Sequence, residues 1–162
     1  MGVNFLEQLV SEWYEYNGYY VRRNVLVGKR PKGGYECELD VVAFHPGKNH
    51  LIQIEPSMDC YSWTKREQRY RKKFDAGRKY IPQLFKGLGV PALIDQVAML
   101  FYASAKNQSK LGGGRIVRVD DFVREVLKEI SVKSVDRDAV PEQFTILRAF
   151  QFAARSTQCE RQ

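Results

Sequence analysis

The stretch that decides the fold runs from Glu36 to Ser57 and reads ECELDVVAFHPGKNHLIQIEPS. Its two halves are rich in β-branched and other apolar residues, and the segment HPGKN between them is typical of a turn. The pattern predicts strands over residues 35–44 and 50–57, which pair antiparallel because the turn is short. With the hairpin centred near Gly47 and Lys48, Asp40 and Glu55 are expected to lie roughly opposite each other.

Carboxylates are placed on both predicted strands. Glu36, Glu38 and Asp40 alternate along the first strand, so they are expected to share one face; solvation on a half-exposed strand is the alternative for Glu36 and Glu38. Asp40 borders a buried apolar run, and Glu55 closes another, with Gln53 on its face. An acid beside a buried run needs a partner or a metal ion. Two carboxylates at the ends of neighbouring strands suit a hard divalent cation.

The elements around this hairpin follow from periodicity and turn residues. We predict a helix over residues 5–16, a strand over 19–27, a long helix over 63–85, and strands over 96–103 and 115–119. Asp120 is expected to cap a further helix, and a last helix is expected over 141–155. We expect Pro82 to end the long helix or to begin a shorter piece, and residues 110–114 to form a flexible loop. The order α-β-β-β-α-β, then β-α-α, predicts an α/β fold with a central mixed sheet flanked by helices.

The composition is that of a globular chain. The 162 residues are 44% hydrophobic and 28% charged, which suits one domain over 1–162, with a core over about 3–103 and a C-terminal extension over about 104–156. No apolar run approaches the ~18 residues of a membrane helix, and the first ten residues do not have the pattern of a signal peptide. The three cysteines include no C-x-x-C pair, which argues against a disulfide scaffold or structural zinc site and favours a cytoplasmic protein.

The positive charge is concentrated on one segment. The chain has 26 Lys and Arg against 19 Asp and Glu, a net charge of +7, and residues 65–80 hold eight bases and two acids, a net charge of +6. Basic side chains along one side of a helix suit phosphates, and Tyr61, Trp63 and Tyr70 offer flat surfaces for unpaired bases. The alternative is a solvated charged face with core aromatic residues. The candidate nucleic-acid-binding residues are Lys65, Arg66, Arg69, Lys72 and Lys73.

The motif ELDVVA at residues 38–43, a glycine-containing turn, and LIQIEPS at residues 51–57 resemble the PD-(D/E)XK nuclease superfamily. The pattern is closest to archaeal Holliday-junction resolvases and Mrr-type restriction endonucleases. The resemblance covers about residues 3–103 and implies a restriction-endonuclease-like αβββαβ core with a C-terminal β-α-α extension. It also implies a DNA endonuclease or nuclease that hydrolyses phosphodiester bonds with Mg²⁺ or Mn²⁺. Similar proteins often form a homodimer to reach both strands of DNA.

The resemblance assigns roles to individual positions. Asp40 and Glu55 correspond to metal ligands, and the backbone carbonyl of Pro56 corresponds to a third. Glu7 matches an extra acid that some members place near the metal, although Asn4-x-x-Glu7 is also a capping box. Further accessory candidates are Glu38 and Gln53.

Ser57 stands where the family has lysine. A serine hydroxyl forms hydrogen bonds but brings no positive charge, and three alternatives stay open. The lysine has moved to the following helix, with Lys72 the first candidate and Lys65 the second. Otherwise Ser57 acts with a second metal ion, or catalysis is lost and the protein is a nuclease-fold DNA-binding or assembly protein. The candidate catalytic residues are therefore Asp40, Glu55, Ser57 and Lys72.

Overall fold

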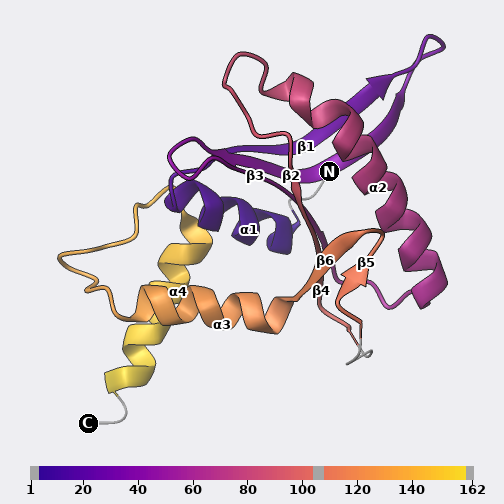
Figure 1. The fold of residues 1–162 in the computed structure, drawn as a ribbon. Coiled ribbons are helices and arrows are strands. Elements are labelled where there is room, and N and C mark those ends of the chain that lie inside the picture. The colour runs from indigo at the N-terminus through magenta and orange to yellow at the C-terminus, as the bar shows by residue number, and fades with distance from the viewer. Residues whose placement is uncertain (1–3, 104–107, 160–162) are drawn as a thin grey trace.

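The computed structural model describes residues 4–103 and 108–159, so the expected boundaries at residues 3 and 104 lie outside the described residues. The elements are α1 (Phe5–Tyr16), β1 (Tyr20–Lys29), β2 (Tyr35–His45), β3 (His50–Ser57), α2 (Trp63–Leu84), β4 (Asp95–Leu100), β5 (Lys110–Leu111), β6 (Gly114–Arg118), α3 (Val119–Ser131) and α4 (Thr145–Cys159). Figure 1 shows their arrangement. In the described part of the chain, no helix is both long enough and apolar enough to cross a membrane.

The strands form one mixed sheet in the order β1-β2-β3-β4-β6-β5. The first three strands are an antiparallel meander, and α2 then crosses over so that β4 pairs parallel with β3. In the β2–β3 hairpin Val41 pairs with Ile54 and His45 with His50. One residue further along, the same register places Asp40 opposite Glu55, as predicted from the short turn between the two strands.

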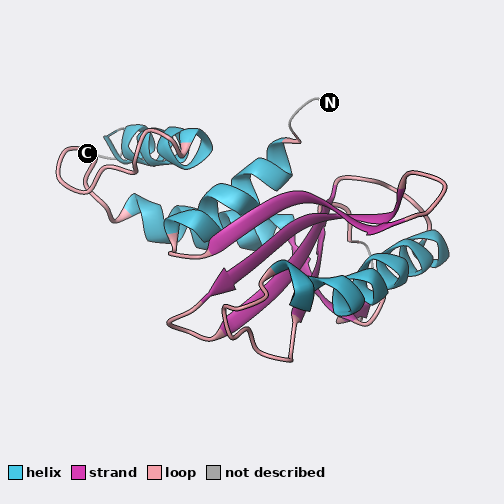
Figure 2. Ribbon diagram, turned by 90° about the horizontal axis from the view of Figure 1, so that it is seen from above, coloured by secondary structure: helices cyan, strands magenta, loops and turns pink. Residues whose placement is uncertain are grey.

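Helices cover both faces of the sheet. Figure 2 shows α1, α3 and α4 on one side of the strands and α2 on the other. The first face buries a cluster that includes Leu9 of α1, Val126 of α3 and Leu147 of α4. The second face buries two smaller clusters against α2, around Ile81 and Phe74. The predicted α/β class, with a mixed sheet flanked by helices, is therefore confirmed.

The alternation of inward and outward side chains changes at one point in β2. Leu39 packs in the cluster on the α2 face, whereas Val41, two residues later, packs in the cluster on the α1 face. In a regular strand these two side chains would share a face. The residue between them is Asp40, and the register places Asn24 of β1 opposite it. Asn24 has a φ of 52°, in the left-handed region, so the two strands change face together at this pair.

One predicted loop is a strand. Residues 110–114 were expected to be flexible, but they form β5, its turn and the start of β6, which pair antiparallel. The turn uses Gly112 and Gly113, whose φ values are 59° and 92°. The backbone N–H of Gly112 donates to the carboxylate of Glu67 at 2.7 Å, which ties the turn to α2. The glycines provide backbone conformations that other residues rarely adopt.

Several helix boundaries also differ from those predicted. Arg118, not Asp120, is the N-cap of α3, and Asp120 lies in the first turn, where its charge suits the helix dipole. Pro82 lies inside α2, which continues for two residues after it. The last helix begins at Thr145 instead of residue 141, and β4 ends at Leu100 instead of residue 103.

Candidate active site

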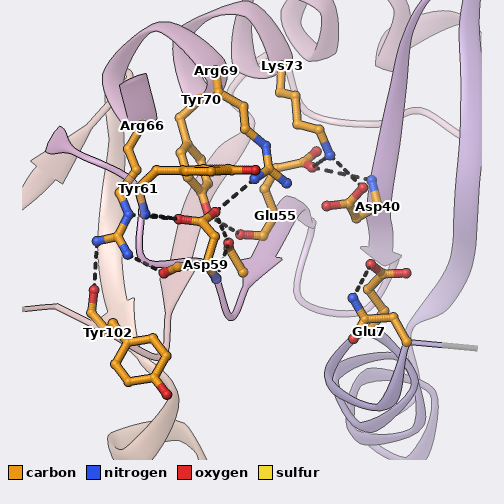
Figure 3. Close-up of polar contacts among 12 residues, drawn as sticks. Glu7, Asp40, Glu55, Asp59, Tyr61, Arg66, Arg69, Tyr70, Lys73 and Tyr102 are labelled. Atoms are coloured by element: carbon orange, nitrogen blue, oxygen red, sulfur yellow. Dashed lines mark hydrogen bonds and ion pairs between the residues drawn. The ribbon is translucent and has the colours of Figure 1, made fainter. Parts of the chain in front are cut away.

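Asp40 of β2 and Glu55 of β3 share one cation, the ammonium group of Lys73 on α2. The Lys73 Nζ lies 2.5 Å from Asp40 Oδ1 and 2.5 Å from Glu55 Oε2 (Figure 3). Both carboxylates therefore point at the Lys73 Nζ. Asp40 Oδ1 and Glu55 Oε2 are no more than twice 2.5 Å apart. The Glu55 side chain is only 1% exposed. We call these three side chains the acid–lysine site.

The lysine at this site is Lys73, which corrects the prediction of Lys72. Lys72 is exposed and lines a surface hollow with Glu36 and Lys79, on another side of α2. Successive helix residues point about 100° apart, so only one of two neighbouring lysines can reach the acids. Lys65, the second candidate, lies over the ring of Tyr61, with its Nζ 3.5 Å from the ring centroid.

Gly77 allows α2 to lie close to the sheet at this site. A Cβ atom added to Gly77 would be 1.9 Å from Gln53 Oε1 on β3. Gly77 follows Lys73 by four residues, so the two residues are on the same face of the helix. The close approach at Gly77 therefore brings the Lys73 side chain within reach of both carboxylates.

Two buried amides orient the Glu55 carboxylate. Gln53 Nε2 donates to Glu55 Oε1 at 2.8 Å and to the Lys73 carbonyl at 3.1 Å. Gln96 of β4 donates in turn to Gln53 Oε1 at 2.8 Å. Gln53 thus holds one carboxylate oxygen and leaves the other for Lys73. Gln96 was not among the sequence candidates, although a polar residue beginning an apolar strand is a signal that could have identified it.

Burial has the largest effect on the protonation of Glu55. It raises the pKa of Glu55 to about 8, with Asp40 adding to the rise, although the Lys73 ammonium acts to lower it. Burial acts to lower the pKa of Lys73, but the Glu55 and Asp40 carboxylates outweigh burial and raise it. Lys73 therefore keeps its charge, while Glu55 holds a proton more readily than an exposed glutamate does.

Glu7 of α1 lies near Asp40 (Figure 3). Burial and the charge of Asp40 raise the pKa of Glu7, and Glu38 has a smaller effect in the same direction. The side-chain amide of Asn4 donates to Glu7 Oε1 at 2.7 Å, and Asn4 Oδ1 accepts from the Leu6 N–H. Glu7 thus interacts with the helix cap and is also close enough to sense Asp40.

The three alternating acids of β2 do not form one group. Glu36 accepts hydrogen bonds from Tyr80 and from Lys79, the latter at 3.3 Å, and Glu38 is half-buried. Only Asp40 reaches Lys73. Glu36 and Asp40 thus contact different turns of α2, and Glu38 affects the pKa of Glu7 on α1, so the three acids are not gathered around Lys73.

Ser57 faces a different partner from the one expected of a residue in the lysine position. Its hydroxyl donates to the carboxylate of Asp59, which also accepts from Arg66 Nε at 3.0 Å and Arg69 Nη1 at 2.8 Å. Asp59 was not among the sequence candidates, because its partners come from a helix turn seven to ten residues later. These contacts fix the β3–α2 connection beside the acid–lysine site.

Arg66 and Tyr70 are held by hydrogen bonds within the protein and are not free side chains on the basic face of α2, which corrects their predicted roles. Arg66 is 5% exposed, and besides Asp59 it donates to the Tyr102 carbonyl at 2.6 Å. Tyr70 is a core residue whose hydroxyl donates to the Glu55 carbonyl at 3.1 Å. Trp63 is half-buried. The exposed bases among the candidates are Lys65, Arg69 and Lys72.

The donor atoms of the acid–lysine site fit a hard divalent cation through two carboxylates. Among the side chains that the structure describes, in residues 4–103 and 108–157, no group of three or more His, Cys, Asp and Glu residues is arranged to hold a metal. Mg²⁺ is commonly held by only one or two carboxylates, with water completing the coordination. The Ser57 carbonyl accepts from Phe101 N–H on the β4 side. Because carbonyls alternate along a strand, the Pro56 carbonyl is expected on the β2 side of β3.

A scan against protein-family models gives no match for the chain. A search of curated proteins also gives no match.

Proposed function

We propose that this protein is a divalent-metal-dependent nuclease that hydrolyses phosphodiester bonds in DNA. The observation that carries the proposal is the convergence of Asp40, Glu55 and Lys73 on one point, with the two acids on neighbouring strands. Hydrolysis of a phosphodiester needs a water to be held and activated, and negative charge on the phosphate to be stabilised. Two carboxylates and one ammonium group are suited to both tasks.

The residues of the site divide these tasks. Asp40 and Glu55 would hold Mg²⁺ or Mn²⁺, and the Pro56 carbonyl is a third candidate donor. When bound, such an ion supplies Lewis acidity, which lowers the pKa of a water ligand and offsets phosphate charge. The Lys73 ammonium donates hydrogen bonds to the attacking water or to a phosphate oxygen. It thereby supplies the positive charge that Ser57 does not.

The surrounding fold supports the same proposal. The αβββαβ order and the acids on adjacent strands agree with a restriction-endonuclease-like core, and exposed bases on α2 agree with DNA as the partner. The free thiols of Cys37 and Cys60 suit the cytoplasm. We include a homodimer in the proposal, since a second copy would bring an acid–lysine site to the other strand of a duplex.

Cleavage assays test the proposal directly. Plasmid DNA and single-stranded DNA are incubated with Mg²⁺ or Mn²⁺ and the wild-type protein, Asp40→Asn, Lys73→Met or the control Lys72→Met. We expect cleavage by the wild type and by Lys72→Met, and little or none by the other two variants. Failure of the wild type to cleave, or equal cleavage by Asp40→Asn, would contradict the proposal. Salt-sensitive DNA binding without any cleavage would instead support a nuclease-fold binding or assembly protein.

A further inference from the structure

A groove with aromatic and basic walls lies beyond the ends of β3 and β4. Its volume is about 440 Å³, within the usual range for ligand pockets. Tyr61 and Tyr102 are 47% and 51% exposed, and Phe101 is also exposed. We call this feature the aromatic groove, and its lining residues are Cys60, Tyr61, Arg66, Phe101, Tyr102, Ala103 and Arg118.

The aromatic groove continues into a second hollow of about 420 Å³. The two cavities share Ala103 and Arg118, and the second one adds the half-buried Trp63 and Ile116. Arg118 is thus shared by two adjoining hollows, each with aromatic lining residues. Two adjoining hollows can hold successive units of a chain-like ligand.

The aromatic groove is a short distance from the acid–lysine site along the same strand. Ser57 follows Glu55 by two residues, about 7 Å along a strand, and its carbonyl accepts from the Phe101 N–H at 3.0 Å. Arg66 links Asp59 to the Tyr102 carbonyl and so holds the two strand ends together. Figure 3 shows Tyr61 and Tyr102 on the side of Glu55 away from Asp40.

Cations lie beside these aromatic rings. The Lys65 ammonium lies over Tyr61, and the Arg69 guanidinium is partly exposed. Arg118 is also partly exposed, and its ion pair with Asp120 is long, at 3.9 Å. These positive charges complement a phosphate backbone, while the exposed rings offer stacking surfaces for bases.

We propose that the aromatic groove binds unpaired nucleotides, so that the substrate is single-stranded DNA or DNA with a single-stranded segment. This inference rests on the proposed function, because it names the DNA form that reaches the acid–lysine site. In a duplex the faces of the bases are already stacked, so exposed tyrosine rings gain little from it. In a single strand each base has a free face, and stacking on an aromatic side chain strengthens binding.

A binding experiment without metal tests the inference. Fluorescence anisotropy in EDTA measures the affinity for labelled oligo(dT), for an abasic oligomer of equal length, and for a duplex. We expect Tyr61→Ala/Tyr102→Ala to weaken oligo(dT) binding about tenfold or more and to leave abasic binding nearly unchanged. The matched control Tyr20→Ala/Tyr35→Ala removes two exposed tyrosines of the β1–β2 hairpin and should alter neither affinity.

The thiol of Cys60 provides a second measurement that uses the wild-type protein. Cys60 is exposed and lines the aromatic groove, whereas Cys37 is half-buried on β2. Saturating oligo(dT) should slow alkylation of Cys60 by N-ethylmaleimide, measured by peptide mass spectrometry, and should leave Cys37 unchanged. Absence of protection at Cys60, or equal loss of affinity in the two tyrosine double variants, would overturn the inference.

The affinity measurement and the Cys60 protection measurement are separable from the cleavage assay because neither of the two depends on metal. Binding and Cys60 protection without cleavage would support the aromatic groove and contradict the nuclease proposal. Cleavage of single-stranded and duplex DNA at equal rates, unaffected by Tyr61→Ala/Tyr102→Ala, would contradict the aromatic groove and leave the nuclease proposal standing.

Discussion

The Lys73 ammonium and the buried Glu55 carboxylate form an ion pair at 2.5 Å, across 18 residues of sequence and between a helix and a central strand. The same ammonium pairs with Asp40. Removal of either partner from a buried pair leaves a charge without compensation, which costs far more than an exposed pair contributes. The acid–lysine site is therefore sensitive to single substitutions.

Lys73→Met should lower both activity and stability. Without the ammonium, which acts to lower the pKa of Glu55, that pKa would rise further, so the loss in the free energy of unfolding should grow with pH and reach about 3 kcal/mol above pH 8, where Glu55 is charged in the wild type. Cleavage, measured under single-turnover conditions, should fall by about 100-fold or more. Lys72→Met is the control, because Lys72 is exposed, and an equal effect of both variants would contradict the assigned role of Lys73.

Stability without metal should fall as the pH rises from about 5 to 8. Burial raises the pKa of Glu55 from 4.5 to about 8, so over this range the folded state binds a proton that the unfolded state has released. Such a group favours folding below pH 4.5, and its contribution is lost as the pH rises through 8. Urea denaturation from pH 5 to 9 measures this slope. The slope should be smaller in Glu55→Gln, and identical slopes in both proteins would refute the assignment.

Divalent metal should reverse this loss at high pH. Metal binding requires the charged form of Glu55, so Mn²⁺ should raise the unfolding temperature more at pH 8.5 than at pH 6. Differential scanning fluorimetry measures the shift. Asp40→Asn should reduce the shift, whereas an equal shift in Asp40→Asn would place the bound ion elsewhere.

Gly77→Ala should destabilise the protein even though alanine is the better helix former. In an open helix this change stabilises by about 1 kcal/mol. Here the added Cβ would be 1.9 Å from Gln53 Oε1, so α2 must move outward and take Lys73 with it. We expect a net loss of about 1–3 kcal/mol and reduced cleavage. Gln53→Ala in the Gly77→Ala background should recover stability, and stabilisation by Gly77→Ala alone would contradict the close approach.

Asn24→Gly and Asn24→Val should have opposite effects. The φ of 52° at Asn24 is easily adopted by glycine and poorly by a β-branched residue. Asn24→Gly should change the free energy of unfolding by less than about 1 kcal/mol, whereas Asn24→Val should cost about 1–2 kcal/mol. Since Asn24 lies opposite Asp40, Asn24→Val should also reduce cleavage. Arg22→Val, at an exposed position of the same strand, is the control.

The hairpin that carries the acids could be predicted from sequence because its determinants are local. The strand period and the short turn fix the register, which places Asp40 opposite Glu55. The choice of Lys72 over Lys73 missed a signal in the helix period. With Tyr70, Phe74 and Ile81 on the buried stripe of α2, steps of 100° place Lys73 beside that stripe and Lys72 on the far side. The close approach of α2 to the sheet could not be predicted, because it depends on Gly77 and Gln53, which are on different elements.

The positions of Arg66 and of the residues of the aromatic groove depend on contacts between residues that are far apart in sequence. Arg66 lies four residues before Tyr70, on the buried stripe of α2, but its charge and its place in a basic run suggested an exposed side chain. Its burial follows from the position of Asp59 and of the Tyr102 carbonyl, which the fold brings to the end of β3. The aromatic groove likewise combines residues of two connections that follow different strands.

The change of face at Asp40 has a mechanical consequence for the candidate active site. Leu39 and Val41, its two neighbours, are both fully buried, one in the cluster beneath α2 and the other in the cluster beneath α1. The peptide that carries Asp40 is thus anchored in both helical layers at once. A substrate that displaces α2 would move the Lys73 ammonium but not Asp40, which stays in register with Glu55. Asp40 and Glu55 are the fixed part of the acid–lysine site, and Lys73 is the part that can move.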